Sequence, residues 1–149
     1  MKTLCIVPCG KRKIWEKFPD AGPLKARDVY IGPYASKCIQ YAQFFYPESW
    51  CILSAKYGFL LPEDIIPETY EVTFKKKWTN PISINELGYQ VNEKGLNSFK
   101  ELVVLGGKVY CDLIEILFEG KNIHKPLWGS SLGPAIKRLN KAIKSGEPL

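Results

Sequence analysis

The chain has 149 residues, which fits one domain, and it carries a formal net charge of +6 at pH 7. Hydrophobic residues make up 46% and charged residues 24%, as in ordinary globular proteins. No apolar run approaches the roughly 20 residues of a membrane-spanning helix, and the apolar run before Gly10 is too short for a secretion signal. We therefore expect a single cytoplasmic domain over residues 1–149, without membrane association.

The predicted elements alternate between apolar runs and amphipathic segments. Short, continuous apolar runs indicate buried parallel strands, apolar residues at helical spacing indicate helices, and clustered Gly and Pro indicate loops. In chain order we predict a strand over 3–8, a loop over 9–22, a helix over 34–46, a strand over 49–54, a loop with a short turn over 61–82, a helix over 85–100, a strand over 101–105, a helix over 109–118, a short strand over 123–128 and a helix over 134–143.

This alternation predicts an α/β fold with three layers, in which helices cover a mainly parallel central sheet of about four strands. In such folds ligands bind beyond the carboxyl ends of the strands. The first three predicted strands run into Cys9–Arg12, Ser54–Gly58 and Gly106–Gly107. We therefore expect these polar and glycine-rich segments to gather at one edge of the sheet and to form the site.

The segment after the first strand has the composition of a phosphate-binding loop. Cys9 and Gly10 come first, and a glycine lets the backbone approach a ligand closely. Lys11, Arg12 and Lys13 follow, and their side chains are charge-assisted donors suited to phosphate. A solvated basic loop is the alternative interpretation, and the position at a strand end favours the functional one.

The segment after the second strand adds Ser54, Lys56, Tyr57 and Gly58. A hydroxyl and an ammonium group at a strand end can hold an anion. A serine nucleophile would need a general base, and the G-x-S-x-G motif of a hydrolase is absent. The Walker and dinucleotide-binding glycine motifs are also absent, which disfavours an ATPase or a Rossmann dehydrogenase.

Carboxylates and tyrosines supply the remaining candidates. Asp28 and Asp64 are candidate site carboxylates, although a capping or salt-bridged role is the common fate of such residues. Tyr30 and Tyr70 are candidates for stacking on a base, which contributes roughly 1–3 kcal/mol per base, and buried structural roles are the alternative.

The five cysteines and the single histidine follow neither a zinc pattern nor a disulfide pattern. We therefore expect no metal site and no cofactor. A thiol enzyme that uses Cys9, with His124 as its partner, stays open as a separate hypothesis.

The strings CGKR, ARDVYIGPY and WCILSAKYGFLLPEDIIPETYEVTF, within residues 3–74, resemble a family of short uncharacterised bacterial, archaeal and phage domains. A weaker echo lies in residues 129–139. The chain departs from that pattern at Tyr34, where Phe is usual, and at Glu71, where Asp is usual; both changes keep the chemical type. More distantly, Ser54–Asp64 and Tyr70–Glu71 are similar to the archaeosine synthase domain, which belongs to the uracil-DNA-glycosylase-like superfamily. The resemblance implies that fold and a pocket for a nucleobase or nucleotide.

Our leading hypothesis is an enzyme that acts on a nucleobase in a nucleic acid or nucleotide, at the N-glycosidic bond or on a modified base. Its catalytic candidates are Asp28, Lys56 and Asp64. Its substrate-binding candidates lie at the two strand ends and in the tyrosine-rich loops: Cys9, Gly10, Lys11, Arg12, Tyr30, Ser54, Tyr57, Gly58 and Tyr70. The alternative is a non-catalytic module that binds nucleic acid or nucleotide, which the net charge of +6 and the tyrosine-rich loops also support.

Overall fold

The apolar runs of the sequence form the inner strands of a mixed sheet in the computed structural model, which describes residues 3–149. Within these residues the central sheet has five strands in the order β4-β3-β1-β6-β7. Their bounds are Thr3–Pro8 for β1, Trp50–Ser54 for β3, Gly58–Leu60 for β4, Glu101–Val104 for β6 and Asn122–His124 for β7. The strands β1, β3, β6 and β7 are parallel, and β4 is antiparallel to β3. The predicted α/β class is confirmed, and β4 is the strand that the sequence did not indicate.

Both faces of the inner strands β1, β3 and β6 are buried, which is why their sequences are predominantly apolar. In β1, Leu4 and Ile6 belong to one core, whereas Cys5 and Val7 belong to the core on the opposite face. Successive side chains of a strand point to opposite faces, so a strand covered on both sides reads as a continuous apolar run. Each such Leu or Ile contributes about 1.5–3 kcal/mol through burial.

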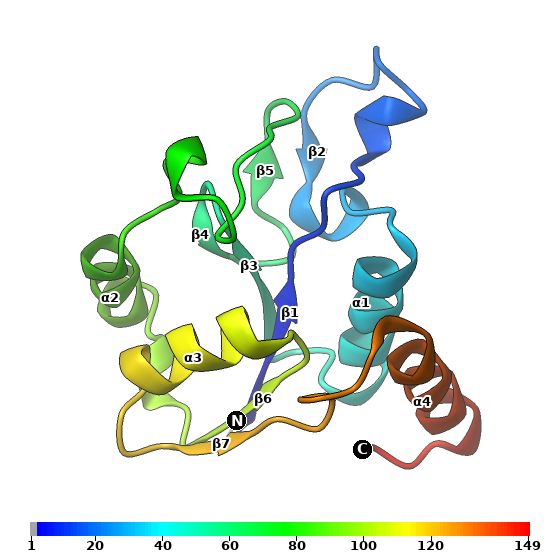
Figure 1. Cartoon of the computed structure of the whole chain (residues 1–149), viewed down its shortest axis with the longest axis vertical. Helices are drawn as coiled ribbons and strands as arrows, with labels where there is room; N and C mark the ends of the chain where they lie inside the picture. The colour runs from blue at the N-terminus through cyan, green and yellow to red at the C-terminus, as the bar shows by residue number, and fades with distance from the viewer. Residues whose placement is uncertain (1–2) are drawn as a thin grey trace.

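Helices cover the two faces in pairs (Figure 1). The helices are α1 at Pro33–Phe45, α2 at Ile84–Glu93, α3 at Lys108–Leu117 and α4 at Leu132–Ser145. Buried residues of α1 and α4 share one core, and those of α2 and α3 share the other. Within residues 3–149, no helix has the length and the apolar character that crossing a bilayer requires.

The helix predicted over 85–100 is shorter in the structure. It ends at Glu93, and Gly95 then adopts a left-handed conformation with φ 70° before a single 3₁₀ turn at Leu96–Ser98. A left-handed residue interrupts the helical hydrogen-bond pattern, and glycine takes that conformation without a steric penalty. The sequence therefore predicts this helix, but not its end at Glu93.

The connections reverse direction at β1. The chain passes from β1 through α1 to β3 on one side, and later crosses back through α2 to β6 on the other side. In sheets of this kind, such a reversal opens a crevice beyond the carboxyl ends of the strands that flank it. The topology therefore places the crevice between the segments that follow β1 and β6.

A small antiparallel ribbon lies beyond the carboxyl edge of the sheet (Figure 1). It pairs β2, Leu24–Lys25, with β5, Ile65–Ile66, and so ties together two segments that the sequence indicated as loop or mixed. Short 3₁₀ turns flank it at Ile14–Glu16 and Ala26–Asp28. These segments form a wall beside the crevice.

Helix α2 holds the turn between β3 and β4 in place. Gln90 Oε1 accepts a hydrogen bond from Phe59 N at 2.8 Å, and Gln90 Nε2 donates to the carbonyl of Tyr57 at 3.0 Å. Lys94 Nζ donates to the carbonyl of Phe59 at 2.5 Å. Gly58 permits this approach, because its φ is +78° and an added Cβ would lie 2.2 Å from Gln90 Oε1.

Candidate functional site

Side chains from two segments meet in the crevice that the topology selects. Cys9 follows β1, and Tyr110 lies in the first turn of α3, directly after β6. Their Sγ and Oη atoms are 3.3 Å apart, and the Tyr110 hydroxyl is also 3.3 Å from the Cys9 carbonyl oxygen. Gly106 makes room for this arrangement, because an added Cβ there would lie 2.7 Å from Tyr110 Cβ. The segments after β1 and β6 are therefore in direct contact.

A chain of buried hydroxyl groups crosses the same edge. Tyr30 Oη lies 2.5 Å from Tyr70 Oη, which lies 2.8 Å from Ser54 Oγ. Ser54 is fully buried, and Tyr30 and Tyr70 are only 3% and 6% exposed. The chain joins the end of β3 to two loops that are far apart in the sequence.

The backbone fixes the direction of the first bond in this chain. Ser54 Oγ accepts hydrogen bonds from the backbone N–H groups of Lys56 and Tyr57, at 3.2 and 3.1 Å. A hydroxyl has two lone pairs and one proton, so Ser54 must donate to Tyr70. The bond between Tyr70 and Tyr30 uses one of their two O–H groups, so the other stays available as a donor, and hydrogen bonds in series strengthen one another.

These hydroxyls stay protonated at neutral pH. Burial raises the pKa of both Tyr30 and Tyr70 well above the usual value, and the neighbouring Tyr70 raises that of Tyr30 further. Burial likewise raises the pKa of Tyr110. The edge therefore presents neutral proton donors rather than phenolate anions.

A buried ammonium group lies against this chain. Lys13 is 3% exposed, and its Nζ donates to the carbonyls of Gly10 and Lys11 at 3.1 and 3.0 Å. The same Nζ is 4.3 Å from the centre of the Tyr70 ring, a cation–π geometry. Burial lowers the pKa of Lys13, against the opposing influence of nearby acidic groups. Lys13 therefore orders the loop after β1 and brings positive charge to the site.

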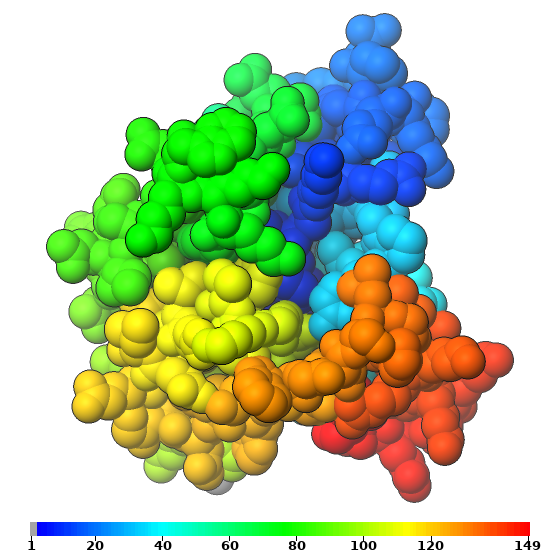
Figure 2. Space-filling model, in the orientation of Figure 1, coloured from blue at the N-terminus to red at the C-terminus, as the bar shows by residue number. Residues whose placement is uncertain are grey.

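A second lysine stands at the mouth of the site. Lys56 is exposed, and its Nζ lies 5.3 Å from the ring centre of Tyr57 and 5.9 Å from that of Tyr70. The two rings meet edge to face, with centres 5.5 Å apart. Figure 2 shows the surface hollowed here, with the blue segment after β1 recessed between the green and cyan segments. An exposed cation and a half-buried aromatic ring thus lie next to the buried donors.

Two helices begin at this edge, and both start at a glycine. The N-cap residues are Gly32 for α1 and Gly107 for α3, and neither helix has a side-chain cap. The N-terminus of a helix carries a partial positive charge and unpaired N–H groups, which favour anions. The backbone therefore adds to the positive potential from the lysines.

The two predicted site carboxylates do not join this cluster. Asp28 is exposed, and among residues 3–149 no hydrogen bond or ion pair links it to the hydroxyl chain. Asp64 closes a turn, because its Oδ2 accepts from Leu61 N at 2.8 Å and lies 3.8 Å from Lys94 Nζ. Both contacts of Asp64 stabilise its own turn and lie outside the hydroxyl chain.

The remaining predicted residues divide between the site and its frame. Lys11 and Arg12 are exposed, and Arg12 Nε lies 3.8 Å from Glu16 Oε1. Gly10 packs on α1, where an added Cβ would lie 3.1 Å from Ala35 Cβ. Gly58 makes room for α2 rather than for the crevice. The structure thus brings together Cys9, Tyr30, Ser54, Lys56, Tyr57 and Tyr70.

Sequence reasoning missed Tyr110, and it named Lys13 only as one of three cations after the first strand. Lys13 is the third cation of a basic run, and charge alone does not show which of the three is buried. Tyr110 lies one helical turn beyond the strand end at Gly106–Gly107, and that position is the signal that could have identified it.

His124 is not the partner of Cys9. Its Nε2 lies 3.2 Å from Glu101 Oε1 at the exposed end of β7, two strands from β1 in the sheet. Within residues 3–149, histidine, cysteine and carboxylate side chains form no group of three that could hold a metal ion. The Cys9 thiol contacts Tyr110 instead.

Comparison with known proteins places the chain in a family. Residues 4–141 match DUF6884, which is described as a family of unknown function. The chain belongs to the DUF6884 family. It is also 42% identical, over the whole of both chains, to a Bacillus subtilis (strain 168) protein named "Uncharacterized protein YfjM". No solved structure matches the chain.

The family match includes the whole site. Cys9, Lys13, Ser54, Tyr70 and Tyr110 all lie within residues 4–141 of the DUF6884 match. The predicted membership of an uncharacterised family is therefore confirmed. The family description states no activity, so the argument for function rests on the geometry of the crevice.

Proposed function

We propose that this edge binds a nucleotide unit, in a nucleic acid or as a free nucleotide, and that the protein acts on its base. The reaction is cleavage of the N-glycosidic bond or chemistry on a modified base. The observation that carries the proposal is the buried hydroxyl chain Ser54–Tyr70–Tyr30, which leaves one tyrosine O–H as a donor beside Lys13.

Such a donor suits a departing base. When an N-glycosidic bond breaks, its electron pair stays with the base, which then carries negative charge on its ring and carbonyl atoms. Fixed hydrogen-bond donors and cations in a water-poor site stabilise this charge as it develops. Removing one donor of this kind typically lowers a rate by about 10²–10³.

The mouth of the site suits the rest of a nucleotide. Lys11, Arg12 and Lys56 are exposed cations there, and the helix N-termini favour an anion, so a phosphate group fits. Tyr57 is half-buried and offers a ring on which a base can stack. The similarity of Ser54–Asp64 to the archaeosine synthase domain, in the uracil-DNA-glycosylase-like superfamily, supports the same substrate class. A base in a duplex would have to be flipped out.

A second candidate function is binding without catalysis. Within residues 3–149 no carboxylate forms a hydrogen bond with the hydroxyl chain, and of the two predicted carboxylates Asp28 is exposed and Asp64 closes a turn. Hydrolysis requires a group that activates water, and carboxylates are common in that role. This observation favours a module that recognises a nucleotide without converting it.

Measurements of ligand binding and of base release distinguish the enzyme from the non-catalytic binding module. We expect Lys56→Ala and Tyr30→Phe to weaken binding of nucleoside monophosphates or short oligonucleotides, measured by calorimetry, by at least tenfold. Lys100→Ala is the matched control, because Lys100 is exposed at the amino end of β6. Unchanged binding in both site variants would contradict the site assignment.

Catalysis is tested by chromatography of the same mixtures. Release or conversion of a base by the wild type, reduced by about 10²–10³ in Tyr30→Phe, supports the enzyme. Binding without any conversion supports the second candidate. Asp28→Ala and Asp64→Ala test the two carboxylates directly, and we expect both variants to retain ligand binding.

A further inference from the structure

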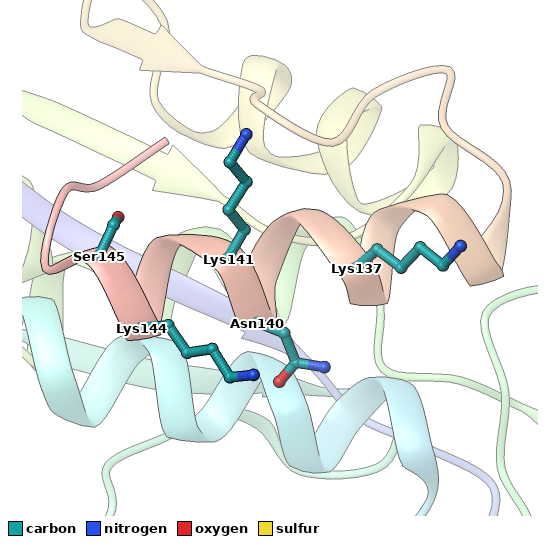
Figure 3. Close-up of a pocket in the computed structure, with 5 residues that line it drawn as sticks. All are labelled: Lys137, Asn140, Lys141, Lys144 and Ser145. Atoms are coloured by element: carbon teal, nitrogen blue, oxygen red, sulfur yellow. The ribbon is translucent and has the colours of Figure 1, made fainter.

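The last helix carries a cationic stripe. Over Leu132–Ser145, α4 contains Lys137, Arg138, Lys141 and Lys144, and no aspartate or glutamate. At 3.6 residues per turn, these four side chains fall within an arc of about 120°. Figure 3 shows the three lysines along the helix, around a shallow depression that Asn140 and Ser145 also line.

Carboxylates do not neutralise this stripe. The ion pairs among residues 3–149 use the carboxylates of Glu16, Glu63, Asp64, Glu101, Asp112 and Glu115, and each of these pairs with a cation outside α4. Arg138 Nη1 donates to a neutral partner, Ser130 Oγ, at 3.2 Å. The positive charge of α4 therefore faces solvent uncompensated.

The opposite face of α4 is already occupied. Ala135, Leu139 and Ala142 are buried and belong to the core that α4 shares with α1. Leu132, in the first turn, is the large apolar residue of α4 that is exposed. One such residue does not make the apolar face with which a membrane-binding amphipathic helix enters a bilayer. Charge complementarity then points to a polyanion in solution, and a nucleic-acid backbone is the polyanion that the carboxyl edge also suits.

An exposed aromatic ring lies beside the stripe. Trp128 is 55% exposed, in the loop between β7 and α4. The bond from Arg138 to Ser130 ties this loop to the first turns of α4. A cationic surface beside an aromatic ring is the arrangement that binds single strands, since bases stack on the ring while lysines contact phosphates.

We infer that α4 and Trp128 bind the backbone and one base of a single nucleic-acid strand. Lys137 to Lys144 span about 10 Å of helix, which matches about three phosphates of one strand. The β7–α4 loop follows the carboxyl end of a parallel strand, so it opens on the same edge as the crevice. With the proposed function, on which this last step rests, the substrate is a polynucleotide and not a free nucleotide.

Salt-dependent binding tests the backbone site. The probe is a fluorescein-labelled single-stranded oligonucleotide of about 20 residues, as DNA and as RNA, followed by anisotropy at several salt concentrations. In the triple variant Lys137→Ala, Lys141→Ala and Lys144→Ala, we expect at least tenfold weaker binding. The slope of log K against log salt should fall by about 2, because each lost phosphate contact removes about 0.7 for a single strand.

The matched control removes two lysines elsewhere, as Lys100→Ala and Lys121→Ala, and is compared with the double variant Lys137→Ala and Lys141→Ala. Lys100 and Lys121 precede β6 and β7 at the amino edge of the sheet, opposite the crevice. We expect this control to bind within about twofold of the wild type. Equal loss in the two double variants would overturn the inference, as would tighter binding to phosphatidylserine vesicles than to the oligonucleotides. Trp128→Ala should weaken oligonucleotide binding about fivefold or more without changing the salt slope.

The proposed crevice site and the proposed backbone site on α4 are tested by different measurements. If the α4 variant loses oligonucleotide binding and keeps monophosphate binding, both the stripe and the crevice are supported. If Lys56→Ala leaves monophosphate binding intact while the α4 variant loses the oligonucleotide, the crevice assignment fails and the backbone site stands. Full oligonucleotide binding by the folded α4 variant, checked by circular dichroism, overturns the inference.

Discussion

Tyr70 is the central residue of the buried hydroxyl chain. Its hydroxyl accepts a hydrogen bond from Ser54 and shares another with Tyr30, and its ring also faces the Lys13 ammonium. All of these groups are buried, so none can exchange its partner for water without a rearrangement. The position of the Tyr70 phenol oxygen therefore determines the hydrogen bonding of the Ser54 and Tyr30 hydroxyls.

Removing that oxygen should destabilise the protein. In Tyr70→Phe, the Ser54 hydroxyl loses its acceptor and the Tyr30 hydroxyl loses its hydrogen-bond partner, and a buried polar group left unpaired costs about 1–3 kcal/mol. We expect the free energy of unfolding, measured by urea titration, to fall by about that amount.

Tyr57→Phe is the control for this comparison. Its ring packs against Tyr70, but among residues 3–149 its hydroxyl has no hydrogen-bond partner. We expect a change of less than about 0.5 kcal/mol, which is usual away from buried networks. Equal effects of the two substitutions would mean that the hydroxyl chain is not formed in solution.

At the scale of elements, the contact between α2 and the β3–β4 turn depends on Gly58. An added Cβ would lie 2.2 Å from Gln90 Oε1, at a φ of +78°. Gly58→Ala must therefore pay for a left-handed conformation, about 1–2 kcal/mol, and must also displace Gln90 from Tyr57 and Phe59. We expect a loss of about 2–4 kcal/mol in the free energy of unfolding.

Gly22→Ala separates the two contributions. Gly22 has a φ of +72°, and no atom lies within 4 Å of its added Cβ, so this substitution measures backbone strain alone. We expect Gly58→Ala to cost more than Gly22→Ala, and the difference to shrink when Gln90 is replaced by Ala. Equal costs in the wild-type background would show that Gln90 does not approach Gly58 as closely as described.

Most elements could be predicted because burial leaves a direct record in the sequence. The runs that become β1, β3 and β6 are apolar at every buried position except Ser54, since both faces of these strands are covered. The strand β4 has only three residues, Gly58–Leu60, too few to show a pattern. The ribbon strands β2 and β5 have two residues each, and tertiary pairing alone makes them visible.

The position of the site could be predicted from the sequence, but not which residues belong to it. Strand-end reasoning placed Cys9 and Ser54 at one edge, and the tyrosine-rich loops contributed Tyr30 and Tyr70. It could not distinguish the buried Lys13 from the exposed Lys11, because a cation's burial depends on the carbonyls folded around it. The sequence also favoured Asp28 and Asp64, because carboxylates suit a site. In the structure Asp64 closes a turn instead, and Asp28 is exposed.

At the scale of the whole molecule, buried phenols and thiols govern the response to alkaline pH. Burial raises the pKa of Cys38 and Cys51 to about 12, and that of Tyr30, Tyr34 and Tyr70 further. In the unfolded chain these groups ionise near pH 8.5 and 10. Their stabilising contribution is complete below the unfolded pKa and is lost as pH rises towards the folded pKa.

We therefore expect the free energy of unfolding to fall by about 5 kcal/mol or more between pH 8 and pH 11, as each group contributes up to about 1.4 kcal/mol per pH unit. Lys13 acts in the opposite direction, because its pKa is lowered on folding, but it is one group against several. Urea titrations at intervals of one pH unit measure the slope. Constant stability up to pH 11 would contradict the burial of these side chains.

The contacts of α2 with Phe59 also affect how one molecule meets another. An edge strand normally exposes backbone N–H and C=O groups that can pair with a strand of a neighbouring protein. At β4 these two groups of Phe59 already bond to Gln90 and Lys94, so helix side chains stand where a sixth strand would add. Gln90, which holds the β3–β4 turn in place, thus also protects this edge of the sheet against intermolecular strand addition and the aggregation that such pairing can start.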